Sequence, residues 1–148
     1  MQNQIQLAYG MLLPLMMSTA QASPTWLECA VTSKISRQQN DGWQLITGPF
    51  KKTEIYVFDS DTKSFGEYNE KEEKITYKHG SAISPGEILY SEDFATGYSD
   101  FIKINRRDGS FLRMDFKKFP DRPGISRTEE GSCRATEPKA VGQPKQRF

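Results

Sequence analysis

Short runs rich in β-branched and aromatic residues recur along most of this 148-residue chain, and turn residues separate them. No apolar stripe with the 3.6-residue period of a helix persists for three turns. Such runs are typical of antiparallel strands. The pattern predicts an all-β protein with eight or nine short strands, at residues 26–33, 43–47, 54–58, 65–68, 74–77, 87–90, 101–106, 111–116 and 132–135.

Strands at this spacing favour a small antiparallel meander, closed as a barrel or packed as a sandwich. The dipeptide Gly42-Trp43 is similar to the early G-x-W of lipocalins, although the intervening residue is missing. A lipocalin-like (calycin-like) barrel is therefore one alternative, and a sandwich is the other.

Residues 101–114 predict one hairpin in detail. A three-residue loop at residues 107–109, with Gly109 left-handed, pairs Ile104 with Leu112 and Ile102 with Met114. A two-residue loop would instead place Ile104 opposite a charged residue. We expect the three-residue loop, and a slip of one residue would turn every side chain to the other face.

The same region carries a resemblance. Residues 104–109 read I-N-R-R-D-G and residues 131–133 read G-S-C. A late I-x-R-x-x-G hairpin followed by G-x-C resembles a broad set of small exported bacterial proteins of unknown function. The resemblance covers about the last third of the chain, implies an envelope location, and implies no catalytic residues.

The first 22 residues contain no Asp, Glu, Lys or Arg. Their apolar run, residues 7–17, is too short to span a bilayer, and it leads to Ala20-Gln21-Ala22. This A-x-A pattern is typical of a signal-peptidase site. We expect residues 1–22 to be a signal peptide cleaved before Ser23, with no integral membrane segment afterwards and a periplasmic or secreted product.

The rest of the chain is expected to form one β domain, residues 23–136. Residues 137–148 contain two prolines, no periodicity and a basic end. These features predict a disordered C-terminal tail.

The two cysteines, Cys29 and Cys133, lie near the two ends of the expected mature chain. An even count in an exported chain indicates a disulfide. A redox pair usually has the C-x-x-C spacing, and zinc needs more ligands than two cysteines and His79 provide. We expect a Cys29–Cys133 bridge that places the first strand beside the last.

Sequence motifs for catalysis are missing. His79 is the only histidine and lies in a turn-like segment, whereas a general base needs a partner that orients it. The chain contains no G-x-S-x-G, P-loop or G-x-G-x-x-G motif. The sequence therefore predicts a protein that is not an enzyme and that uses no cofactor.

A weak calcium candidate is formed by Asp59, Asp61 and Glu70, at positions 1, 3 and 12 of an EF-hand-like loop. Lys63 occupies position 5, where an oxygen ligand is needed, and Ser64 occupies position 6, where the turn needs glycine. We expect an ordinary acidic turn and no metal.

Charge is divided unevenly along the chain. Residues 23–100 carry 8 Lys/Arg and 13 Asp/Glu, a net −5, whereas residues 101–148 carry 12 and 6, a net +6. The basic part indicates a surface for an anionic envelope component or an unknown protein, or else a solvated face balanced by the acidic part. A pI near 7.7 disfavours nucleic acid. The possible binding surface comprises Arg106, Arg107, Asp108, Arg113, Phe116, Lys117 and Lys118.

These observations lead to one main hypothesis and two alternatives. The main hypothesis is a monomeric exported module that binds a partner or associates with the envelope without catalysis. The first alternative is an inhibitor of a secreted or periplasmic enzyme that presents the loop at residues 107–109. The second is a barrel that binds a small ligand.

The processing expectation is tested by the intact mass of protein recovered from the periplasm of an expression host. We expect a chain that starts at Ser23 and weighs two hydrogens less before reduction than after it. Retention of residues 1–22 together with two free thiols would contradict both the cleavage and the bridge.

Overall fold

Nine antiparallel strands follow one another around a single curled sheet in the computed structural model, which describes residues 23–142. The strand order is β4-β3-β2-β1-β9-β8-β7-β6-β5. The strands are β1 (Thr25–Gln39), β2 (Gly42–Asp59), β3 (Ser64–Asn69), β4 (Lys74–Tyr77), β5 (Ala82–Ile83), β6 (Glu87–Phe94), β7 (Tyr98–Asn105), β8 (Ser110–Lys117) and β9 (Ile125–Thr136).

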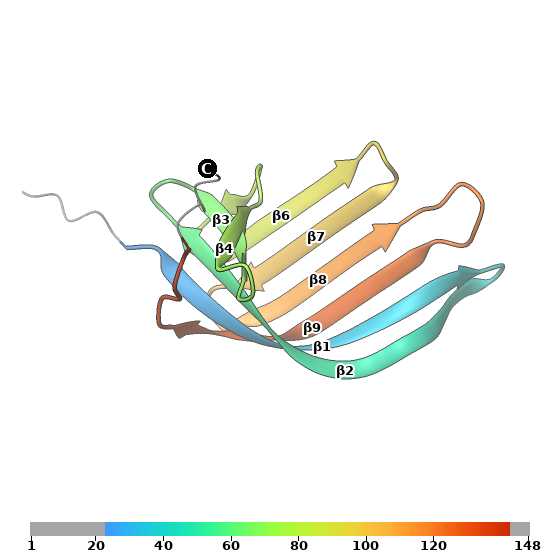
Figure 1. Ribbon diagram of the computed structural model, residues 1–148, viewed down its shortest axis with the longest axis horizontal. Coiled ribbons are helices and arrows are strands. Elements are labelled where there is room, and N and C mark those ends of the chain that lie inside the picture. The colour runs from blue at the N-terminus through green and yellow to red at the C-terminus, as the bar shows by residue number, and fades with distance from the viewer. Residues whose placement is uncertain (1–22, 143–148) are drawn as a thin grey trace, which may run out of the picture.

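The sheet forms a half-barrel (Figure 1). At one end, which we call the closed end, β3 and β4 fold over toward β6 and β7. At the other, the splayed end, the long strands β1 and β2 diverge from β6 and β7. Within residues 23–142, no helix is long and apolar enough to cross a membrane.

The predicted all-β class is confirmed, and the strands form one curled sheet rather than two packed sheets. Two predicted strands, 43–47 and 54–58, are parts of the single strand β2, because β2 pairs with β1 on both sides of β-bulges at residues 46 and 48–49. The two-residue strand β5 was not predicted. β9 begins at Ile125, seven residues earlier than predicted, because a polar run there pairs with both β1 and β8.

The pairing of β9 with β1 joins the two halves of the sheet. β5 to β9 form one meander and β1 to β4 form another, and the β9–β1 ladder runs from Trp26↔Thr136 to Arg37↔Ile125. Cys29 and Cys133 lie directly opposite each other in this ladder and form the disulfide. The predicted bridge is therefore confirmed, and it suggests an oxidising environment outside the cytoplasm.

The predicted register of the β7–β8 hairpin is wrong by one residue. Ile104 pairs with Phe111 and Ile102 with Arg113, because the loop has four residues, 106–109, instead of three. The side-chain oxygen of Asn105 accepts hydrogen bonds from the backbone N–H groups of residues 107 and 108. The N–H of Gly109, which has a left-handed φ of 76°, donates to the carbonyl of Asn105.

This register decides which side chains fill the half-barrel. Side chains alternate between the two faces of a strand, so Phe111 and Arg113 point to the concave face and Leu112 and Met114 to the convex face. A buried apolar cluster fills the concave face near the closed end. It comprises Cys29, Val31, Tyr56, Phe58, Phe65, Ile83, Ile88, Tyr90, Ile102, Ile104 and Phe111.

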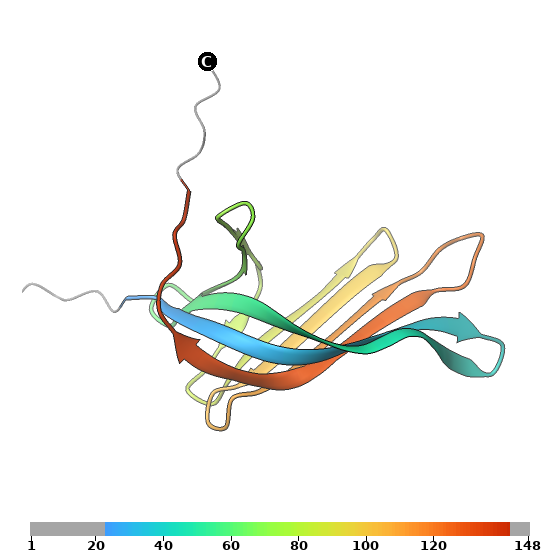
Figure 2. The same cartoon turned by 60° about the horizontal axis from the view of Figure 1, so that its bottom comes forward.

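A smaller cluster covers the other face of β1–β3, where the Trp26 and Tyr68 rings meet edge to face with centroids 5.2 Å apart. Residues 137–142 have no regular secondary structure and pass beside this cluster. The Tyr68 hydroxyl donates to the carbonyl of Ala140, and the N–H of Gly142 donates to the carbonyl of Glu73. The rest of the predicted tail, residues 143–148, and the predicted signal peptide lie outside the described residues (Figure 2).

The disulfide is expected to contribute a large part of the stability, because it restrains strands that are 104 residues apart in the sequence. On the chain-entropy model a loop of this length contributes about 4 to 5 kcal/mol. Cys29→Ser should therefore lower the melting temperature markedly, as measured by circular dichroism without reductant. An unchanged melting curve would show that the bridge does not stabilise the fold.

Candidate functional site

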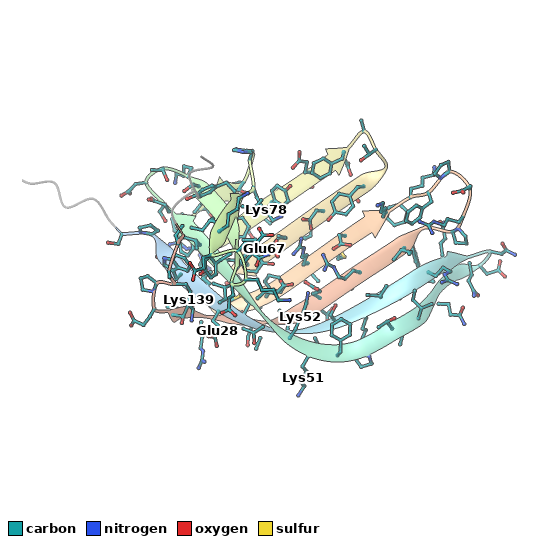
Figure 3. All side chains as sticks on the ribbon, viewed as in Figure 1. Glu28, Lys51, Lys52, Glu67, Lys78 and Lys139 are labelled. Carbon is teal, nitrogen blue, oxygen red and sulfur yellow. A yellow bond between two sulfur atoms is a disulfide. The ribbon has the colours of Figure 1, made fainter. Side chains whose placement is uncertain are left out.

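Nine charged side chains form a layer across the concave face, next to the apolar cluster on the side of the splayed end. We call this group the ion layer; it comprises Lys52, Glu54, Glu67, Lys78, Asp100, Arg113, Asp115, Arg127 and Glu129. Strand alternation produces most of it, because each member except Lys78, which directly follows β4, lies in a strand an even number of positions from a concave apolar residue. Figure 3 shows Lys52, Glu67 and Lys78 within the curl of the sheet, whereas Lys51 points away from it.

Arg113 lies at the centre of the ion layer and is 5% exposed. Its Nε and Nη2 atoms each donate to an Asp100 carboxylate oxygen at 3.0 Å, and Nη1 donates to Glu67 at 3.3 Å. Burial alone would lower the pKa of the guanidinium, but the acceptors around it, with Tyr56 and Glu67 first, raise the pKa and keep it protonated. Loss of one partner of a buried ion pair costs about 3 to 5 kcal/mol.

Lys52 joins two carboxylates that come from different strands. Its Nζ lies 2.6 Å from Glu54 Oε1 and also contacts Glu129 Oε1. Tyr56 donates to Glu54 Oε2 at 2.6 Å, and Ser33 donates to Glu129 Oε1 at 3.2 Å. Glu129 Oε2 is buried and has no hydrogen-bond partner among the described residues.

The two carboxylates respond differently to burial. Burial opposes ionisation of Glu54, but hydrogen bonds from Lys52 and Tyr56 outweigh it and lower the pKa. Burial raises the pKa of Glu129, and the hydrogen bond from Lys52 only partly offsets this effect while nearby Glu54 adds to it. Glu129 therefore takes up a proton more readily than Glu54.

The ion layer is mainly a structural feature, because its members, apart from Glu129 Oε2, satisfy one another. Arg113 and Asp100 are almost fully buried and form a bidentate pair. Such pairs fix geometry more than they add stability. A ligand that entered here would have to displace these ion pairs. The accessible surface beyond the layer is therefore the better candidate for a binding site.

At the splayed end, a cleft of about 820 Å³ lies between the β1–β2 turn and the β8–β9 loop. It is lined by residues 37–43 and by Pro123. Two contacts hold its walls together: the N–H of Gln38 donates to the carbonyl of Gly124 at 2.9 Å, and the Trp43 ring meets the Phe116 ring edge to face at 5.6 Å.

Arg37 lines this cleft, and further basic side chains lie in the β8–β9 loop, which contributes Pro123 to the lining, and at the end of β8. The Arg122 guanidinium lies 3.9 Å from the centroid of the Phe119 ring, and the Lys117 Nζ lies 5.3 Å from the same centroid. Residues 37–43 carry one Arg and one Asp, and residues 116–124 carry three Lys/Arg and one Asp. The two segments together therefore have a net charge of +2. Arg37, Lys117, Lys118 and Arg122 are exposed.

The residues of the predicted binding surface lie in three separate places. Arg106, Arg107 and Asp108 lie in the β7–β8 loop at the closed end, where Arg106 donates to the carbonyl of Ser84 at 2.6 Å. Arg113 is buried in the ion layer. Phe116, Lys117 and Lys118 lie at the splayed end of β8, about 25 Å from the β7–β8 loop at about 3.3 Å per residue.

The weak calcium candidate is not assembled as a cluster. Asp59 accepts hydrogen bonds from the N–H groups of Asp61 and Thr62 within its own turn. Glu70 follows the opposite end of β3, about 20 Å away for a six-residue strand. Among residues 23–142, no group of three His, Cys, Asp or Glu side chains is placed to hold a metal ion.

Sequence reasoning missed most of the ion layer and half of the cleft. Arg113 pairs with the buried Ile102, so a correct β7–β8 register would have placed Arg113 on the concave face together with Asp100. Arg37 and Trp43 gave no such signal, because they meet residues 116–124 only through the β9–β1 pairing.

Comparison with known proteins found no matching family model, no matching curated protein and no matching solved structure. Arguments about function therefore depend on the geometry described above.

The raised pKa of Glu129 is expected to affect stability. A carboxyl group whose pKa is higher in the folded than in the unfolded chain binds a proton more readily when folded. Its contribution to the free energy of unfolding therefore grows as the pH falls from neutrality through that raised pKa. Glu129→Gln removes this contribution.

Urea unfolding at about pH 7 and about pH 5 measures this effect. We expect the native protein to gain stability relative to Glu129→Gln on acidification, whereas Glu130→Gln, a change at an exposed neighbouring position, should follow the native protein. A difference between native protein and Glu129→Gln that does not change with pH would contradict the assignment.

Proposed function

We propose that this protein is an exported, non-catalytic binding module that holds an anionic envelope component at the cleft of the splayed end. The observation that carries the proposal is the cleft between the β1–β2 turn and the β8–β9 loop, which is lined by Arg37 and Trp43 and has Arg122 next to its lining residue Pro123. Periplasmic or secreted placement belongs to the same proposal. It is supported by the disulfide and by the expected signal peptide.

The chemistry of the cleft favours an anionic ligand with apolar surface. Cations that stack on aromatic rings keep their charge exposed while their orientation is restricted. Arg122 and Lys117 share the Phe119 ring in this way. Trp43 lines the cleft, is half-exposed and offers a flat apolar face. A carboxylated sugar polymer or an anionic lipid headgroup presents the matching combination.

The rest of the molecule supports the cleft as a rigid frame. Its two walls come from β1–β2 and β8–β9, which are adjacent through the β9–β1 ladder and the disulfide. Binding on a preformed surface loses less conformational entropy than binding on mobile loops. The proposed site therefore depends on the fold being intact.

The test is binding of the purified mature protein to polygalacturonate and to vesicles of phosphatidylglycerol in phosphatidylcholine, at low and at moderate salt. The double variant Lys117→Gln/Arg122→Gln should bind between about 2-fold and 30-fold more weakly, because each exposed charge pair contributes about 0.2 to 1 kcal/mol. Added salt should reduce this difference, because it screens exposed charges.

The matched control is Lys71→Gln/Lys74→Gln, which removes the same charge at the β3–β4 turn and should bind as the native protein does. Equal loss in both double variants would mean that binding follows net charge and would contradict the cleft. If the only interaction found is with a secreted enzyme and Arg107→Ala abolishes it, the inhibitor alternative is favoured instead.

A further inference from the structure

The two faces of the sheet exchange polarity toward the splayed end. Near the closed end the concave face is apolar, whereas toward the splayed end its positions carry the ion layer. All nine strands belong to one sheet, so at the splayed end no second layer of the described residues covers the convex face (Figure 2). The side chains on that convex face are uncharged over a broad area, which is the opposite of the ion layer behind them.

Strand pairing traces this uncharged area from β8 to β2. Met114 and Phe116 are in the convex phase of β8, and opposed residues of an antiparallel pair point to the same face. Phe116 pairs with Ser126 of β9, which pairs with Ser36 of β1. Ser36 in turn pairs with Leu45 of β2. This placement of Leu45 does not depend on alternation along β2, which the β-bulges at residues 46 and 48–49 interrupt.

The area extends to both sides of this row. Met114 pairs with Phe101 of β7 and with Thr128 of β9. Trp43 reaches the same face, since its ring meets the Phe116 ring edge to face at 5.6 Å. We call the uncharged residues of this convex area the neutral band; it comprises Ser36, Trp43, Leu45, Phe101, Met114, Phe116, Ser126 and Thr128.

The neutral band exposes large apolar side chains. Trp43, Leu45 and Met114 are 50%, 48% and 45% exposed. Charge returns only around the band on the convex face, with a net value of +1, at Lys34, Lys51, Asp93, Lys103 and Glu130. A contiguous exposed apolar area with a charged rim is typical of a surface that meets a partner or a membrane.

We propose that the anionic component held at the splayed end is a lipid bilayer, and that the neutral band lies in the bilayer interface. This inference rests on the proposed anion binding and names its ligand. A carboxylated polymer supplies charge but no apolar phase, so it would leave Leu45 and Met114 in water. The boundary between headgroups and acyl chains supplies both, because binding there increases with buried apolar area and with attraction to anionic lipids.

Trp43 connects the cleft with the neutral band. It lines the cleft and also contacts Phe116 of the band, and tryptophan is enriched where a membrane meets water. The basic residues of the β8–β9 loop lie at the same end of the sheet, and each Lys or Arg near an anionic membrane strengthens binding. Hydroxyl groups lie between the apolar side chains of the band and need hydrogen-bond partners. The band therefore suits the headgroup boundary and not the acyl core.

Flotation of the mature protein with vesicles of phosphatidylglycerol in phosphatidylcholine tests the proposal, beside binding to polygalacturonate, which offers charge alone. Leu45→Gln/Met114→Gln should lower the apparent affinity for the vesicles about 10-fold to 100-fold, because two half-exposed apolar side chains lose their apolar contact. The same variant should bind polygalacturonate as the native protein does.

The matched control is Tyr77→Gln/Val141→Gln, which changes side chains that are 52% and 53% exposed but lie outside the neutral band. It should bind both ligands as the native protein does. Circular dichroism melting checks that each variant is folded.

Tryptophan fluorescence tests whether the band enters the interface. Trp26→Phe leaves Trp43 as the only tryptophan of the chain. The emission of Trp43 should shift to shorter wavelength on the anionic vesicles, and lipids brominated on the acyl chain near the headgroup should quench it. Polygalacturonate should cause no such shift.

The outcomes separate this inference from the proposed anion site. Vesicle binding without a shift or quenching of Trp43 emission would overturn the bilayer assignment and leave the anion site standing, as would equal vesicle affinity of Leu45→Gln/Met114→Gln and the native protein. Vesicle binding that depends on the neutral band but is unchanged in Lys117→Gln/Arg122→Gln would support the bilayer and contradict the anion site.

Discussion

The ladder between β9 and β1 is the constraint on which the rest of the structure depends. It is the point where a meander from the end of the chain meets a meander from its beginning, and the cost in chain entropy of bringing them together rises with the length of the loop between them. The Cys29–Cys133 bridge lies within this ladder, so the two strands remain adjacent even where their side chains are polar. Both walls of the cleft and both sides of the ion layer are brought together by it.

The ion layer follows from a sheet that curls without closing. Near the closed end, side chains from facing strands meet and exclude water, so the filling is apolar. Toward the splayed end the strands diverge, and there the concave positions carry Arg113, Asp100, Glu129 and their partners. Buried ion pairs are costly to break. A slip of one residue in β8 would move Arg113 to the convex face and leave Asp100 with Lys78 as its only cationic partner, so the layer helps to fix the register of the sheet.

The strands could be predicted from the sequence, because the pattern of apolar and turn residues is a local signal. The disulfide could be predicted because two cysteines in a chain that is expected to be exported indicate a bridge. The sequence did not allow the β7–β8 register to be predicted, because Asn105 adds one residue to the loop by capping two backbone N–H groups. The assumption that Arg113 must avoid the apolar face was reasonable for an isolated hairpin. It failed because the carboxylates that neutralise Arg113 lie outside the predicted hairpin of residues 101–114: Asp100 directly precedes it on β7, and Glu67 comes from β3. The cleft was missed for a similar reason, since its two walls are about 80 residues apart in the sequence.

The distal β1–β2 hairpin buries little of its own surface, since every residue of β2 from 42 to 51 is exposed. Ten residues of ordered strand cost conformational entropy that burial within this chain does not offset. The side of the hairpin toward β9 borders the cleft. A ligand held in the cleft would bury part of this surface, so the exposed hairpin and the proposed binding site belong to the same feature of the fold.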